Sequence, residues 1–135
     1  MAIILDADVI IGGERGVFDL AAWAASRPSD LFEVAAITVA ELWHGVERAS
    51  EPHKSKRRKY LETIVAALPV ILYTEQTAYE HARLWADLQA AGKMIGAYDL
   101  IIAATALERG SQVATFNKRH FSRVKGLQVI EPKIT

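Results

Sequence analysis

The stretch that decides the fold is Ala2-Ile-Ile-Leu-Asp6-Ala-Asp8, near the start of the chain. It begins with a continuous apolar run, which is typical of a strand buried on both faces of a sheet. Asp6 follows this run directly, and Asp8 lies two residues further on. A carboxylate beside a buried strand is costly to desolvate unless it is paired or bound to a metal ion. We therefore expect Asp6 to have a functional role.

Strands and helices alternate along the remaining chain. Val34 to Ile37 is a second short apolar run, whereas apolar residues over 17–26 recur at the spacing of a helix. Further strands are predicted at 70–72, 112–114 and 127–130, and further helices at 38–48, 60–68, 78–88 and 97–109, with a helical turn near Phe121. Helices between successive strands imply right-handed crossovers, a mostly parallel sheet and helices on both of its faces. The predicted fold is an α/β sandwich.

Length and composition exclude several classes of protein. The 135 residues are 51% apolar, contain no cysteine, and carry sixteen basic and sixteen acidic side chains. These values predict one domain over residues 1–135, and they exclude a disordered chain, a disulfide scaffold and a thiolate metal site. The longest uncharged apolar runs, 63–74 and 100–107, are too short to cross a membrane, and the N-terminus lacks the basic start of a signal peptide. We therefore expect a cytoplasmic protein without a membrane segment.

Oxygen-bearing side chains follow the predicted strands at several separate points. Glu41 lies just beyond the second strand, and Asp99 lies near the start of the helix that leads into the fourth strand. Thr115 and Asn117 directly follow the fourth strand. Because open α/β sheets build their sites at the carboxyl ends of strands, we expect these side chains to meet Asp6 at one edge. Crowded carboxylates repel one another unless a cation such as Mg²⁺ or Mn²⁺ neutralises them, so the sequence predicts a divalent-cation site.

Each of these residues also has a purely structural interpretation. Thr38-Val-Ala-Glu41 matches a capping box, in which Glu41 would only bond the backbone at the helix start. Asp99 would gain from the dipole of its helix, and Asn117 and Thr115 are ordinary residues of turns and strand ends. Their joint placement, more than any single side chain, favours the metal site.

Four segments of the chain resemble the motifs of PIN domains, in the order in which that family has them. The segments are Ile3-Ile-Leu-Asp6-Ala-Asp8-Val-Ile, Ile37-Thr-Val-Ala-Glu41-Leu-Trp-His-Gly45, Gly96-Ala-Tyr-Asp99-Leu-Ile-Ile-Ala-Ala-Thr105-Ala and Thr115-Phe-Asn117-Lys-Arg-His-Phe121. Within the family, the chain is most similar to VapC-type toxins of bacterial toxin–antitoxin pairs. The resemblance implies a PIN-like α/β/α sandwich and a Mg²⁺-dependent endoribonuclease in which Mn²⁺ can substitute. It also implies a cytoplasmic homodimer that a small cognate antitoxin inhibits, in a heterotetramer or a larger complex.

The resemblance assigns roles to individual residues. Asp6, Glu41 and Asp99 match the three metal-site acids of the family, and Asn117 matches a fourth acidic position that is Asp in many members. Asp8 stands where the family usually has Ser, Thr or Asn. It would either restore the charge missing at Asn117 or change the contacts around the metal ligands, as Thr115 would. By this resemblance, a metal-activated water attacks an RNA phosphodiester in line.

Basic residues are concentrated in two windows, which changes the meaning of the zero net charge. The windows 54–59 and 109–130 hold ten of the sixteen basic residues, and the second contains no acid. Lys118 and Arg119 adjoin the predicted site and are candidates for contacts with RNA phosphates. The 54–59 cluster is better explained as a solvated helix face.

Two histidines and most of the aromatic residues are expected to have structural rather than catalytic or RNA-binding roles. His44 and His120 are expected to be structural or solvent-facing. Most of the aromatic side chains that could stack on RNA bases are expected to lie in the core or an interface instead; they are Trp43, Tyr73, Tyr79 and Trp85. The exposed parts of the helices 17–26 and 39–48 are candidates for an antitoxin groove.

Two other functions fit parts of the sequence. Asp6-Ala-Asp8-Val also resembles the motif of haloacid-dehalogenase-like phosphatases, with Asp6 as nucleophile and Asp8 as general acid. Those enzymes need a later Asp, and none follows Asp99. The other alternative is a non-catalytic metal- or RNA-binding module. A receiver-like module would need an Asp after the third strand, where this chain has Tyr73-Thr-Glu75.

Overall fold

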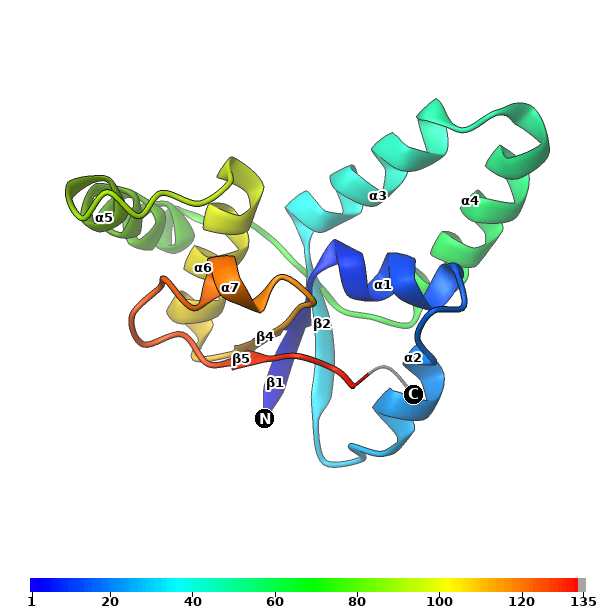
Figure 1. Cartoon of the computed structure of the whole chain (residues 1–135), viewed down its shortest axis with the longest axis horizontal. Coiled ribbons are helices and arrows are strands. Elements are labelled where there is room, and N and C mark those ends of the chain that lie inside the picture. The colour runs from blue at the N-terminus through cyan, green and yellow to red at the C-terminus, as the bar shows by residue number, and fades with distance from the viewer. Residues whose placement is uncertain (134–135) are drawn as a thin grey trace.

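Five short parallel strands form the centre of the computed structural model, which describes residues 1–133 (Figure 1). They are β1 (Ala2–Leu5), β2 (Leu31–Ala35), β3 (Val70–Ile71), β4 (Gln112–Ala114) and β5 (Val129–Ile130). The strand order is β3-β2-β1-β4-β5, and each neighbouring pair is parallel. The predicted parallel sheet is thus confirmed.

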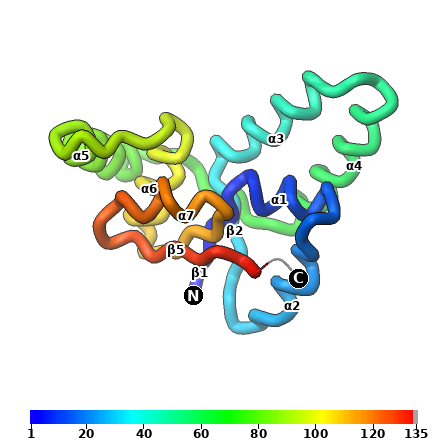
Figure 2. Tube along the Cα trace, in the orientation of Figure 1, coloured from blue at the N-terminus to red at the C-terminus, as the bar shows by residue number. Residues whose placement is uncertain are grey.

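Helices cover both faces of this sheet. They are α1 (Ala7–Glu14), α2 (Leu20–Ala25), α3 (Ala36–Arg48), α4 (Glu51–Ala66), α5 (Glu75–Ala90), α6 (Ala97–Arg109) and α7 (Lys118–Phe121). Figures 1 and 2 show α5, α6 and α7 on one side of the sheet and α1 to α4 on the other. No helix within residues 1–133 is both long and apolar enough to cross a membrane.

Each face of the sheet has its own hydrophobic core, because successive strand residues point to opposite faces. Ile4 of β1 packs into the core that α5 and α6 cover, with Leu84 and Ile102. Its neighbours Ile3 and Leu5 pack into the core on the side of α1 to α4. All three side chains are almost completely buried, as the continuous apolar run predicts.

The structure corrects several details of the sequence analysis. Helix α4 begins at Glu51, nine residues before the predicted helix over 60–68. Helix α1 was not predicted, although Asp6, which caps it, is a residue type that favours a helix start. The second strand ends at Ala35 rather than Ile37, so α3 begins two residues earlier than expected. The capping box is therefore wrong. Thr38 is completely buried inside α3 with its hydroxyl unpartnered, and the helix has no side-chain cap.

The strand order places a switch point beside β1. The chain proceeds outward from β1 through β2 to β3, and then crosses back to β4 and β5 on the other side of β1. Connections that leave neighbouring strands in opposite directions open a crevice at their carboxyl ends, which is where such sheets bind ligands. Asp6 and Thr115 follow the two strands that flank this crevice, β1 and β4.

Candidate active site

Asp6 is the most deeply buried of the candidate acids, with 6% of its surface exposed. It caps α1: its Oδ1 accepts a hydrogen bond from the backbone N–H of Ala7 at 2.8 Å. Its Oδ2 accepts one from the Thr115 hydroxyl at 2.8 Å. Burial, and next the negative charge of Asp8, raise the pKa of Asp6 to about 7, against the lowering effect of the Thr115 bond. Asp6 thus combines a fixed orientation with an uncompensated charge.

Asp8 ties the end of β4 to α1. Its carboxylate accepts hydrogen bonds from the backbone N–H of Phe116, at 3.1 Å to Oδ2. The hydroxyl of Thr115 lies 3.3 Å from the same oxygen, and Thr115 in turn accepts a bond from the N–H of Asn117 at 2.9 Å. Burial raises the pKa of Asp8. Asp8 and Thr115 therefore hold the 115–117 turn against the start of α1.

Glu41 approaches the same crevice from α3. Its Oε1 is buried and has no hydrogen-bond partner. Burial raises the pKa of Glu41, and the charges of Asp99 and Asp8 raise it further. Because the helix start lies at Ala36, Glu41 is not engaged in capping and its carboxylate is free to face the other acids.

Asp99 reaches the crevice from the first turn of α6, and His120 lies beside it. His120 Nδ1 is 3.8 Å from Asp99 Oδ2 and 2.8 Å from Asn117 Nδ2. Burial raises the pKa of Asp99, against the lowering effect of His120. His120 is thus a part of the site that the sequence analysis assigned to structure or solvent. Its spacing of three residues from Asn117, across one turn of α7, is the signal that would have predicted this contact.

Four carboxylates lie close enough to influence one another's pKa, and we call this cluster the acidic pocket; they belong to Asp6, Asp8, Glu41 and Asp99. Within residues 1–133, no Lys or Arg forms an ion pair with any of the four, and His120 is the one basic side chain that approaches them. The described residues also contain no group of three or more His, Cys, Asp or Glu side chains already arranged to hold a metal ion. The four carboxylates are thus close enough to raise one another's pKa, but they are not arranged as a complete set of metal ligands.

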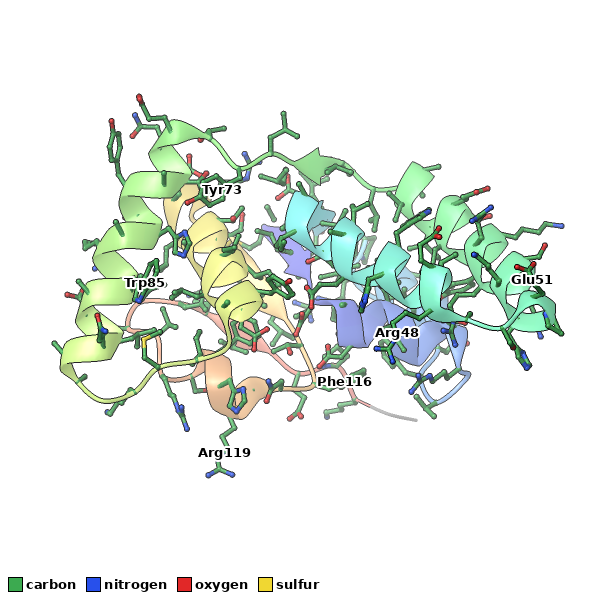
Figure 3. The ribbon with its side chains drawn as sticks, turned by 90° about the horizontal axis from the view of Figure 1, so that it is seen from above. Arg48, Glu51, Tyr73, Trp85, Phe116 and Arg119 are labelled. Carbon is green, nitrogen blue, oxygen red and sulfur yellow. The ribbon has the colours of Figure 1, made fainter. Side chains whose placement is uncertain are left out.

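The predicted residues outside the acidic pocket are mostly at the surface. Lys118 and Arg119 are exposed at the start of α7, and Figure 3 shows Arg119 pointing away from the body of the molecule. His44 is also exposed. Trp43 packs against the core as expected. The core alternative is wrong for three aromatic residues, whose exposed fractions are 46% for Tyr73, 61% for Tyr79 and 50% for Trp85, and their place in an interface stays a prediction.

Comparison with known proteins identifies the family of this chain and supports its fold. The family model of the PIN domain matches residues 3–127. The chain belongs to the PIN domain family. This PIN domain is 30% identical over 131 residues to Ribonuclease VapC1 of Rickettsia felis, covering 96% of each chain. It is 32% identical over 96 residues to the tRNA(fMet)-specific endonuclease VapC of Salmonella typhimurium, covering 71% of each chain.

A solved structure agrees with these relatives. The DNA-bound VapBC from Salmonella typhimurium matches this PIN domain with a TM-score of 0.86 and 26% sequence identity, covering 97% of this chain and 98% of that one. The resemblance to VapC-type PIN domains and the predicted sandwich are therefore confirmed. Relatives named as ribonucleases support nuclease activity over the phosphatase and binding-module alternatives.

Proposed function

We propose that this PIN domain is a Mg²⁺-dependent endoribonuclease and the toxin of a toxin–antitoxin pair. The observation that carries the proposal is the acidic pocket, in which four carboxylates meet at the switch point of the sheet without a Lys or Arg partner among residues 1–133. Similarity to proteins named as ribonucleases supports RNA as the substrate. Mn²⁺ would substitute for Mg²⁺, since both bind carboxylate oxygens and water.

A divalent cation fits the donors of the acidic pocket. Oxygen ligands suit Mg²⁺, and the Oε1 of Glu41 is buried without a partner. A nearby dication would counteract the burial and repulsion that raise the pKa values of these acids. Asp6 and Asp99 would hold the ion, and Glu41 would bind it directly or through water. These side chains would have to turn toward the ion, because residues 1–133 hold no ready-made ligand set.

The remaining residues position these groups and the RNA. When bound, the cation supplies an activated water and stabilises charge on the phosphoryl oxygens. The Thr115 hydroxyl keeps the Asp6 carboxylate in one orientation. The contact of His120 with Asn117 orients the amide, whose carbonyl oxygen is the atom able to contribute to the site. Lys118 and Arg119 would bind phosphates next to the cleaved bond.

We propose that Asp8 supports the site and does not replace the acid missing at Asn117. Its oxygens already accept hydrogen bonds from the backbone of Phe116 and lie close to the Thr115 hydroxyl. We therefore assign Asp8 to the support of the 115–117 turn and of Asp6, and Asn117 to a neutral position beside Asp99. This arrangement favours one tightly held cation over two.

An apolar groove between α2 and α4 fits the proposed antitoxin. The groove has a volume of about 500 Å³, and its lining includes Phe18, Leu20, Tyr60 and Ile64. The sequence analysis expected such a surface on the helix over 17–26, which contributes to it, and on 39–48, which does not. An apolar segment of an antitoxin would bury this surface. A homodimer and a heterotetramer or larger complex with the antitoxin remain part of the proposal.

Cleavage assays with purified protein test the proposed function. We expect Mg²⁺ or Mn²⁺ to support cleavage of RNA, with initiator transfer RNA and an unstructured RNA as separate substrates. EDTA should abolish cleavage, and Asp6→Asn or Asp99→Asn should lower it by about a thousandfold or more, because each removes a charged ligand. Adding the product of the gene next to this one, if it encodes a small protein, should inhibit the wild type.

A matched control tests whether the position of the removed charge matters, rather than the removal of a charge alone. Asp19→Asn makes the same chemical change at an exposed residue that caps α2, and Asn caps helices as well as Asp does. This variant should keep wild-type cleavage. Full activity of the wild type in EDTA, or of Asp99→Asn in Mg²⁺, would end the proposal.

A further inference from the structure

A second cavity lies between the C-terminal half of α5 and the segment that follows α7. It has a volume of about 340 Å³, and its lining includes Leu84, Leu88, Lys93, Arg123 and Lys125; we call it the Lys93 cavity. Figures 1 and 2 show the segment after α7 on the same side of the sheet as α5 and α6. Segments about 30 residues apart in the sequence thus meet at one surface.

Most charged side chains of the Lys93 cavity are positive, and three of them have no acidic partner in the described residues. Within residues 1–133, none of Lys93, Arg123 and Lys125 forms an ion pair. The cavity is also lined by Arg83 and Asp87. Arg83 pairs with Asp87 at 2.9 Å and with Glu80 as well, so it is already engaged by two acids. Three positive charges therefore remain for a ligand, above a floor that includes Leu84 and Leu88, each 4% exposed.

One of these charges is held in place by the backbone. Arg123 Nη1 donates a hydrogen bond to the carbonyl oxygen of Met94 at 2.9 Å, which joins the loop before α6 to the segment after α7. Met94 precedes Asp99 by five residues, so the two lie at most about 18 Å apart. The exposed Lys118 and Arg119 are on the same segment as Arg123. Basic residues thus recur along the segment that begins beside Asn117 and ends at the Lys93 cavity.

We propose that the Lys93 cavity binds backbone phosphates of the RNA substrate, away from the bond that is cut. The inference rests on the proposed ribonuclease function, since it names a second contact for the same substrate. Singly charged phosphates in series match a row of lysines and arginines, and such contacts do not depend on base sequence. The volume suits a nucleotide-sized group better than a protein helix.

Binding measurements on a double variant test this inference. Lys93→Gln/Lys125→Gln removes two exposed charges that make no hydrogen bond or ion pair in the described residues. Both changes are made in an Asp6→Asn background, which prevents turnover, with a fluorescein-labelled unstructured RNA of about 20 nucleotides as the probe. We expect Kd to rise about 25-fold near 0.1 M salt and the salt slope to fall by about 1.4, because each lost single-strand contact removes about 0.7.

The matched control removes the same charge elsewhere. Lys56→Gln/Lys59→Gln changes two exposed lysines of α4, on the opposite side of the sheet. This control should leave the Kd for RNA within about twofold of the Asp6→Asn parent. If both double variants weaken binding equally, affinity depends only on net charge and the inference is overturned. Unchanged RNA binding by the cavity pair, with loss of binding to polyglutamate, would reassign the cavity to an acidic protein partner.

Cleavage separates failure of this inference from failure of the proposed function. With Asp6 intact, Lys93→Gln/Lys125→Gln should raise KM for the long RNA while kcat stays unchanged. Cleavage of an RNA of about four nucleotides, which spans only the acidic pocket, should be unaffected. Wild-type protein that cleaves neither RNA in Mg²⁺ contradicts the proposed function. Wild-type cleavage with identical KM values for the variant contradicts only the phosphate site.

Discussion

Two buried carboxylates, Glu33 in β2 and Asp6 at the end of the neighbouring β1, lie in opposite electrostatic surroundings. Glu33 of β2 is 8% exposed, and its Oε2 accepts a hydrogen bond from Arg109 Nη2 at 3.0 Å. Asp6, which follows β1, is similarly buried but faces Asp8 and Asp99 instead of a basic residue. A buried charge with a partner belongs to the structure of the fold, whereas a buried cluster of like charges destabilises it. The contrast locates the functional site without reference to any motif.

The largest expected effect is on the pH dependence of the free energy of unfolding, to which Asp6 should contribute strongly. The pKa of Asp6 rises from 3.8 in the unfolded chain to about 7 in the folded protein, so between these values the folded state holds a proton that the unfolded state has released. The free energy of unfolding should therefore fall as pH rises from about 4 to about 7, by up to about 4 kcal/mol, and then level off. Urea unfolding in EDTA measures this.

Two variants sharpen that measurement. Asp6→Asn should remove most of the decline, because its amide does not titrate. Glu33→Gln should leave the decline in place, because it does not touch the acidic pocket. A wild-type profile that stays flat between pH 4 and 7 would contradict the uncompensated burial of Asp6.

Breaking the paired site should have a smaller effect, on stability alone. Arg109→Met leaves Glu33 buried without its cation, which should lower the free energy of unfolding by about 2 kcal/mol. The value is below the usual range for buried pairs because Arg109 is 39% exposed. The folded variant should still cleave RNA normally. Adding Glu33→Gln should recover part of the stability, and a double variant no more stable than Arg109→Met would show that the pair is not the cause.

The smallest effect should come from adding Mg²⁺ to the unpaired site. At ten times Kd, binding to the folded state stabilises it by about 1.4 kcal/mol, which should raise Tm by roughly 5 °C. Thermal unfolding followed by circular dichroism gives the shift. Asp99→Asn should lose it and Glu33→Gln should keep it. If Mg²⁺ leaves the Tm of the wild type unchanged, or raises the Tm of Asp99→Asn as much as that of the wild type, the acidic pocket does not bind the cation.

Much of the fold and of the site follows from local patterns. Continuous apolar runs marked β1 and the other buried strands, and the helix ending at Gly110 was predicted with its bounds. Asp6, Glu41 and Asp99 were expected at one edge, and the structure brings them together. Helix α1 was missed because its apolar run, residues 9–11, is too short for its periodicity to separate helix from strand, and Asp6 was assigned to function rather than to capping.

By itself, the sequence determined the alternation of strands and helices and the positions of the acids along the chain, because apolar periodicity and spacing are local properties. Only the tertiary structure decided that Glu41 is free of capping, that His120 joins Asp99 and Asn117, and that Lys93 meets Arg123. These contacts depend on which distant segments the strand order places side by side. That order is set by the packing of two cores against one sheet, which no single stretch of sequence contains.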